Sequence, residues 1–212
     1  MNKTIFAKVF LWMFFGLLLT FGTGYFVSTN ENMLYSIFTK GYYWFFLIAE
    51  LVAVIFLSAR IQKMKPMTAK ITFLLYSFLT GLTFSTIFVV YALDSVLYVF
   101  LISAIVFGIF AMIGFFTHMD LTKIGTYLMM GLLAVIALLV FNLFIPSDSF
   151  QIFISIISIL VFLGFTAYDV QKIKQLEFTM EEDNLAIYGA LQLYLDFINI
   201  FLDLLRLFGK DN

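Results

Sequence analysis

The stretch LAIYGALQLYLDFINIFLDLLRLF, residues 185–208, decides the fold of this chain. It is long enough to cross the hydrocarbon core of a bilayer, yet small or polar residues recur in it at spacings of three and four. At helical geometry these residues share one face, while leucine and isoleucine fill the opposite face. They are Gly189, Gln192, Asp196, Asn199, Asp203 and Arg206. A helix surrounded by lipid would not repeat polar groups so regularly, so we expect this helix at the centre of a bundle.

The composition of the whole chain agrees with a membrane location. Of its 212 residues, 63% are hydrophobic and 12% are charged, whereas soluble globular proteins have about 45–50% and about 25%. So few charges could not cover the surface of a soluble protein of this length. The net charge of −1 gives no electrostatic case for a nucleic-acid partner, and without cysteine there is no disulfide or thiolate metal site.

Uncharged runs set the number of membrane crossings. Five such runs are each about as long as a spanning helix requires, and 41–59 and 185–208 are also apolar but carry charged residues. The short polar turns between the runs favour antiparallel neighbours. We therefore predict an all-α, integral membrane bundle of seven transmembrane helices, with a central C-terminal helix, forming one domain over residues 1–212. The predicted spans are 9–28, 41–59, 71–92, 96–117, 124–145, 149–170 and 185–208.

The cations of the short loops predict the orientation in the membrane. The first apolar run follows two lysines, as in a signal peptide, but it is long and lacks an A-x-A-like cleavage site, so we interpret it as a retained span. Lys3, Lys8, Arg60, Lys63, Lys65, Lys70, Lys123, Lys172 and Lys174 fall on the side of the N-terminus, against Lys40, Arg206 and Lys210 on the other. This asymmetry predicts a cytoplasmic N-terminus and a C-terminus outside. Arg206 and Lys210 lie on the predicted outer side, against the preference of cations for the cytoplasmic side. A last helix that re-enters the membrane without crossing it therefore stays an alternative.

Ionisable residues inside the predicted spans are costly and mark candidate sites. Asp196 lies far from both ends of the last helix, without a neighbouring cation. Asp169 and Arg60 end two spans on the same predicted side, so we expect them to meet, in a contact that could be bidentate. If the helix of Asp169 continues beyond the predicted span, Asp169 also approaches Asp196, and the two carboxyls would share a proton. The alternative is a purely structural role, in which the polar residues of 185–208 hold helices together and Asp203 pairs with Arg206.

Glu50 falls at the centre of the second predicted span. Two interpretations stay open for it. The carboxyl is either protonated and hydrogen-bonded to a hydroxyl of a neighbouring helix, or it lines an ion path.

Two stretches resemble the C-terminal signature of the Bax inhibitor-1 family, also called transmembrane BAX inhibitor motif proteins. They are AYD at 167–169 and LYLDFINIFLDLLRLFG at 193–209. The resemblance extends to chain length, the seven spans and the placement of Glu50 and Arg60. It implies a bacterial-type member in the cell (inner) membrane, acting as a pH-sensitive calcium leak without cofactor. Some bacterial relatives are instead associated with control of a membrane-bound AAA protease, which implies a membrane-protein partner.

Matched residue by residue, the resemblance makes Asp169 and Asp196 the pH sensor and Arg60 the latch that holds Asp169. The same two aspartates become candidate calcium ligands, because calcium binds carboxylate and amide oxygens. Asp203 departs from the family pattern, where an uncharged residue is expected, and it either adds a cation ligand or pairs with Arg206. The candidate ion-path or cation-binding residues are Glu50, Asp196, Asn199 and Asp203.

Two aspartates on adjacent helices also occur in intramembrane aspartyl proteases, and YD at 168–169 matches the first half of their signature. The second half needs Gly-x-Gly directly before the aspartate, but residues 193–195 read Leu-Tyr-Leu before Asp196. Neither Pro66 nor Pro146 belongs to a Pro-Ala-Leu element. Bulky side chains would fill the space that substrate must enter, so this enzyme is only a third alternative and we expect no enzymatic activity.

The predicted orientation can be tested by cysteine labelling, because the chain has no native cysteine. Lys65→Cys and Asp94→Cys should react with a membrane-impermeant reagent from opposite sides, Asp94→Cys from outside the cell. The reverse pattern would overturn the topology, and with it the expected meeting of Arg60 and Asp169.

Overall fold

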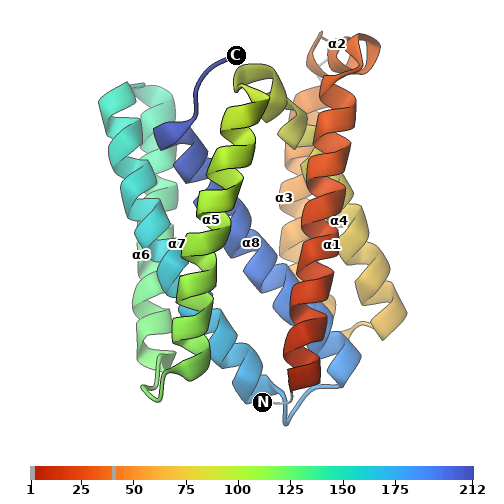
Figure 1. Cartoon of the computed structure of the whole chain (residues 1–212), viewed down its shortest axis with the longest axis vertical. Helices are drawn as coiled ribbons and strands as arrows, with labels where there is room; N and C mark the ends of the chain where they lie inside the picture. Colours follow the sequence, from red (N-terminus) through yellow and green to blue (C-terminus); the bar gives the residue numbers. More distant parts are fainter. Residues whose placement is uncertain (1–2, 40–41) are drawn as a thin grey trace. The chain divides into compact units, whose positions relative to one another are not determined.

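The computed structural model describes residues 3–39 and 42–212, and these are almost entirely helical (Figure 1). Within this part of the chain there are eight α-helices, one short 3-10 helix and a single isolated bridge between Tyr91 and Asp211. The elements are α1 (Lys3–Ser28), α2 (Glu31–Thr39), α3 (Tyr42–Arg60), η1 (Ile61–Lys63), α4 (Pro66–Val90), α5 (Leu93–Phe116), α6 (Thr122–Phe144), α7 (Asp148–Leu176) and α8 (Glu182–Phe208).

Six of the described helices are long and apolar enough to cross a membrane: α1, α4, α5, α6, α7 and α8. They correspond to six of the seven predicted spans. The helix α3 covers the second predicted span from Tyr42 onward but is not among the six, so the seventh crossing stays a prediction. Residue 41 of that span and Lys40 of the charge comparison lie outside the described residues.

Most of the long helices extend beyond their predicted spans, and α1, α4 and α7 do so by more than one helical turn. The helix α4 begins at Pro66 instead of residue 71, because proline suits the first helical turn, where its missing N–H would have no partner. The helix α7 continues to Leu176, so Asp169 lies two turns inside it. A helix does not need to end where the hydrocarbon ends, since lysines of its last turns can extend toward water. The short helix α2 was not predicted at all.

The contacts of the chain divide it into two compact units. The first comprises Met1–Leu93, Leu176–Tyr194 and Asp211–Asn212, and the second comprises Asp94–Gln175 and Leu195–Lys210. The helix α8 thus contributes its first half to one unit and its second half to the other. That residues 1–212 form one domain stays a prediction.

In the first unit, α1 packs along α4 through small residues (Figure 1). A side chain at Gly81 would meet Thr23 and the carbonyl of Thr20, so only glycine permits this approach of the two backbones. The Thr20 hydroxyl donates to the carbonyl of Ser77 (2.9 Å) and shares a hydrogen bond of 2.6 Å with the Tyr194 hydroxyl. Tyr194 is fully buried, so these bonds satisfy a polar atom that has no access to water.

In the second unit, α7 packs closely on α5 and α6. A side chain at Gly114 would overlap the backbone of Ala167, and one at Gly125 would overlap the ring of Tyr168. From α8, Phe197 makes edge-on ring contacts with Phe100 and Phe107. The apolar stretch of α8 is 78% buried, against 50% or less for the other five spans, as its polar face predicted.

The glycine contact between α5 and α7 gives a testable expectation. Gly114→Ala should lower the melting temperature, because overpacking of this kind costs about 1–3 kcal/mol. Gly108→Ala is a matched control on the same helix, since nothing lies within 4 Å of the added atom, and it should leave the melting temperature unchanged or raise it. Equal effects of the two changes in a thermal unfolding assay would contradict the close approach.

Candidate functional site

Two carboxyl groups are buried together in the second unit. Asp169 of α7 and Asp196 of α8 are each only 4% exposed, and the two carboxyl groups lie close enough to interact electrostatically. One carboxyl oxygen of Asp196, Oδ2, is buried without a hydrogen-bond partner among the described residues. The structure therefore brings together the two aspartates that the sequence singled out.

A buried pair of carboxyls restricts its own chemistry. Two such groups cannot both be ionised cheaply, because each negative charge repels the other and neither is solvated. A buried oxygen without a donor also costs about 1–3 kcal/mol. A proton or a cation relieves both costs, so the arrangement is suited to holding one or the other.

Side chains beyond Asp169 fix the last turns of α7. The Gln171 side chain accepts a hydrogen bond from the Leu121 N–H (2.8 Å) and donates one to the carbonyl of Met119 (2.7 Å). The ammonium of Lys174 donates to the carbonyl of Phe115 at 3.1 Å. These bonds attach the end of α7 to the connection between α5 and α6. These bonds could not be predicted from the sequence, because glutamine and lysine near a helix end usually indicate a solvated turn.

The proposed latch residue belongs to the other unit. Arg60 is the exposed last residue of α3, in the first unit, whereas Asp169 belongs to the second. The contact between Arg60 and Asp169 therefore stays a prediction.

Glu50 is half-buried on α3 and has a hydroxyl partner. The hydroxyl of Thr83 on α4 donates to its Oε2 at 2.9 Å, within the first unit. A hydroxyl of a neighbouring helix is the partner expected for a protonated, structural Glu50. A carboxyl with one such partner can also line an ion path, so both interpretations of Glu50 stay predictions. Thr83 stands in an apolar run of the sequence, where nothing connects its hydroxyl with α3.

The remaining polar residues of α8 have local partners. The amide of Asn199 donates to the carbonyl of Leu195 at 2.7 Å, which leaves its oxygen directed away from that bond. The guanidinium of Arg206 donates to Asp203 Oδ1 at 2.7 Å, so the pairing within α8 is formed. The same nitrogen also donates to the hydroxyl of Ser155 on α7, at 3.0 Å, a contact that the sequence did not predict.

Metal-binding capacity is limited in the described part of the chain. No group of three or more histidine, aspartate or glutamate side chains there could hold a metal ion. Calcium takes about 6–8 oxygen ligands in a tight site. The two buried aspartates alone supply fewer oxygens than a tight calcium site takes.

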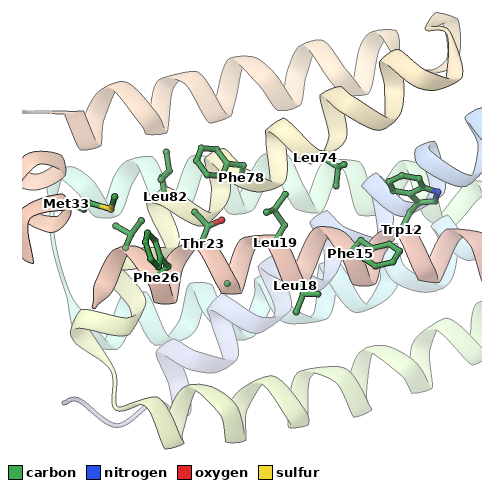
Figure 2. A pocket seen from close by; sticks show the side chains of 12 residues that line it. Trp12, Phe15, Leu18, Leu19, Thr23, Phe26, Met33, Leu74, Phe78 and Leu82 are labelled. Atoms are coloured by element: carbon green, nitrogen blue, oxygen red, sulfur yellow. The ribbon is translucent and has the colours of Figure 1, made fainter. Parts of the chain in front are cut away.

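A separate pocket of about 830 Å³ lies in the first unit, between α1, α2 and α4 (Figure 2). Figure 2 shows Trp12 near one end of it and Met33 near the other. Apart from the indole of Trp12 and the hydroxyl of Thr23, apolar side chains and one glycine line it. No carboxylate or amide side chain lines it, so it suits apolar groups better than a cation.

A set of long apolar helices with buried carboxyl groups defines an integral helical membrane protein. The family described as "Inhibitor of apoptosis-promoting Bax1" matches residues 2–212. The chain is 39% identical over 216 residues to "Inner membrane protein YbhL" of Escherichia coli (strain K12), covering 98% of this chain and 92% of that protein. The chain therefore belongs to the Bax inhibitor-1 family.

Two further relatives extend this similarity to other bacteria. An uncharacterized protein of Borreliella burgdorferi is 38% identical over 99% of this chain and 92% of its own length. An uncharacterized membrane protein of Streptococcus pyogenes serotype M1 is 40% identical over 78% of this chain and 73% of its own length. The resemblance found in the sequence is thus confirmed at the level of the family.

Proposed function

We propose that this protein is a pH-sensitive calcium leak channel of the bacterial inner membrane, with Asp169 and Asp196 as its sensor. The observation that supports this most is the buried pair of interacting carboxyls on α7 and α8. The unpartnered Oδ2 of Asp196 adds to it, because an oxygen of this kind is satisfied by a proton or a cation.

The chemistry of a leak suits the limited number of ligands. Conduction requires a site that binds the ion strongly enough to admit it and weakly enough to release it. Asp169 and Asp196 supply carboxylate oxygens, and the amide oxygen of Asn199 lies one turn along α8. Asp203 and Glu50 complete the proposed set of ion-path residues.

The proposed gate is the attraction between Arg60 and ionised Asp169. When Asp169 takes up a proton, this ion pair becomes an ordinary hydrogen bond, and the helices that carry the two residues are free to separate. The exposed position of Arg60 at the end of α3 supports a role as the movable partner. Acidification from neutral pH should thus open the path, while protonation of both aspartates should weaken its affinity for calcium.

Two other functions predict different behaviour. A regulator of a membrane-bound AAA protease or another membrane protein would carry no calcium by itself. An aspartyl protease needs room for a peptide beside the aspartates, but Leu193 and Tyr194, which precede Asp196, are large and fully buried. This crowding supports a protein without enzymatic activity.

Calcium flux into proteoliposomes that contain only this chain tests the proposal. Wild-type flux should rise and then fall as pH decreases from neutral. Asp196→Asn keeps the shape but removes the charge, so it should change flux by about tenfold or more and flatten the pH response; tenfold corresponds to about 1.4 kcal/mol. The exposed Asp148→Asn on α7 is the control and should behave like wild type. Wild-type flux at every pH in Asp196→Asn would reject this sensor, and no flux from wild type would favour the regulator.

The latch has its own test. Arg60→Ala should make the path leaky at neutral pH and abolish the rising part of the pH profile, because ionised Asp169 then lacks its cation. Lys63→Ala, which removes an exposed cation three residues later, should keep wild-type closure. If Arg60→Ala vesicles remain as closed as wild type at neutral pH, the latch is formed by another residue.

A further inference from the structure

The end of α8 carries a partly buried ion pair that the proposed sensor does not use. The side chain of Asp203 is 9% exposed, and its Oδ1 accepts a hydrogen bond of 2.7 Å from Arg206 Nη1. The same nitrogen donates to the Ser155 hydroxyl of α7 at 3.0 Å. The Ser158 hydroxyl of α7 also hydrogen-bonds Asp203. The guanidinium thus lies among oxygen atoms that two helices provide.

These oxygens are of the type that hard cations bind. Carboxylate and hydroxyl oxygens are calcium ligands, and here a positive charge already occupies the position between Asp203 and Ser155. The guanidinium cannot lose its proton, so it leaves this position only by moving. Arg206 is therefore a cation that the chain itself supplies to this position.

The two partners differ in their exposure, which indicates which one moves. The Arg206 side chain is 33% exposed, whereas that of Asp203 is nearly buried. A long cationic side chain near a helix end can extend into water or toward headgroups, but a carboxylate on a short stem cannot follow it. If Arg206 swings outward, Asp203 is left as a buried charge without a counterion, which is costly until another cation arrives.

A purely structural role explains the pair poorly. Apolar residues of similar volume often hold helices together as well as a buried ion pair, or better. Hydroxyl groups such as those of Ser155 and Ser158 can join membrane helices, but they do not need a charged partner to do so. A charged acid with two hydroxyls and a removable cation is instead what an ion-exchange site requires.

We propose that Asp203 and Ser155 form a second cation-binding site, which the guanidinium of Arg206 occupies at rest and a divalent cation takes over when it binds. Its place on a calcium path rests on the proposed function; the site itself does not. Removing each partner should therefore have opposite effects. Without Arg206 the site is open and negative, and without Asp203 only a fixed positive charge remains, which repels cations.

Calcium binding to the purified full-length chain, measured by isothermal titration calorimetry, tests the site directly. Arg206→Gln should bind calcium at least about tenfold more tightly than wild type, because the competing cation is gone. The double variant Asp203→Asn, Arg206→Gln should lose that gain, and Ser155→Ala added to Arg206→Gln should reduce it. Equal calcium affinity of wild type and Arg206→Gln would overturn the proposal.

A second variant covers a failure of Arg206→Gln to fold. Arg206→Lys keeps the charge, but an ammonium is more strongly hydrated than a guanidinium and should occupy the site less, so the calcium affinity should lie above that of wild type. An affinity equal to that of wild type would again contradict the site.

Flux in proteoliposomes separates this inference from the proposed function. Arg206→Gln should increase calcium flux and Asp203→Asn should decrease it, whereas a structural pair would change both in the same direction. If no variant conducts but the binding pattern holds, the leak function fails and the cation site stands. If wild type conducts and the binding pattern is absent, the site fails and the leak stands.

Discussion

The repulsion between the carboxyls of Asp169 and Asp196 is the interaction on which the functional account depends. Both groups are buried in a chain with very few charges, so water cannot solvate them. Two other acids of the apolar helices have partners, Glu50 in the Thr83 hydroxyl and Asp203 in Arg206. The aspartate pair instead leaves an oxygen of Asp196 without a donor. The proposed response of the pair to protons and cations depends on that imbalance.

The surrounding structure keeps this unfavourable pair in place. At Gly114 the backbone of α7 approaches α5 directly before Asp169, and Gln171 attaches the next turn to the connection between α5 and α6. Close packing on this side holds the part of α7 that carries Asp169 against α5, which limits how far this carboxyl can move away from Asp196. The pair of Asp203 and Arg206 differs from the aspartate pair, because a cation of the chain itself balances the charge of the carboxylate.

Much of the fold follows from the sequence because lipid imposes a simple rule on length and apolarity. Six long helices and the polar face of α8 could be predicted from runs and spacings alone. The end of α7 could not, since Gln171 and Lys174 continue the helix for reasons that lie on α5 and in its loop. The contact of Ser155 with Arg206 could not be predicted either, because one serine in an apolar run does not indicate which helix faces it. Asp169 and Asp196 were found because acids inside spans are rare, and their roles stay predictions along with the Arg60 latch.

The central claim is that Asp169 and Asp196 titrate as one unit, and infrared spectroscopy of the carboxyl bands tests it most directly. The protein in lipid would be titrated as wild type, Asp169→Asn and Asp196→Asn, with the double variant as the baseline for all other acids. The account predicts that the wild-type curve differs from the sum of the two single-variant curves, because each carboxyl responds to the charge on the other. A wild-type curve equal to that sum would show two independent acids and contradict the account.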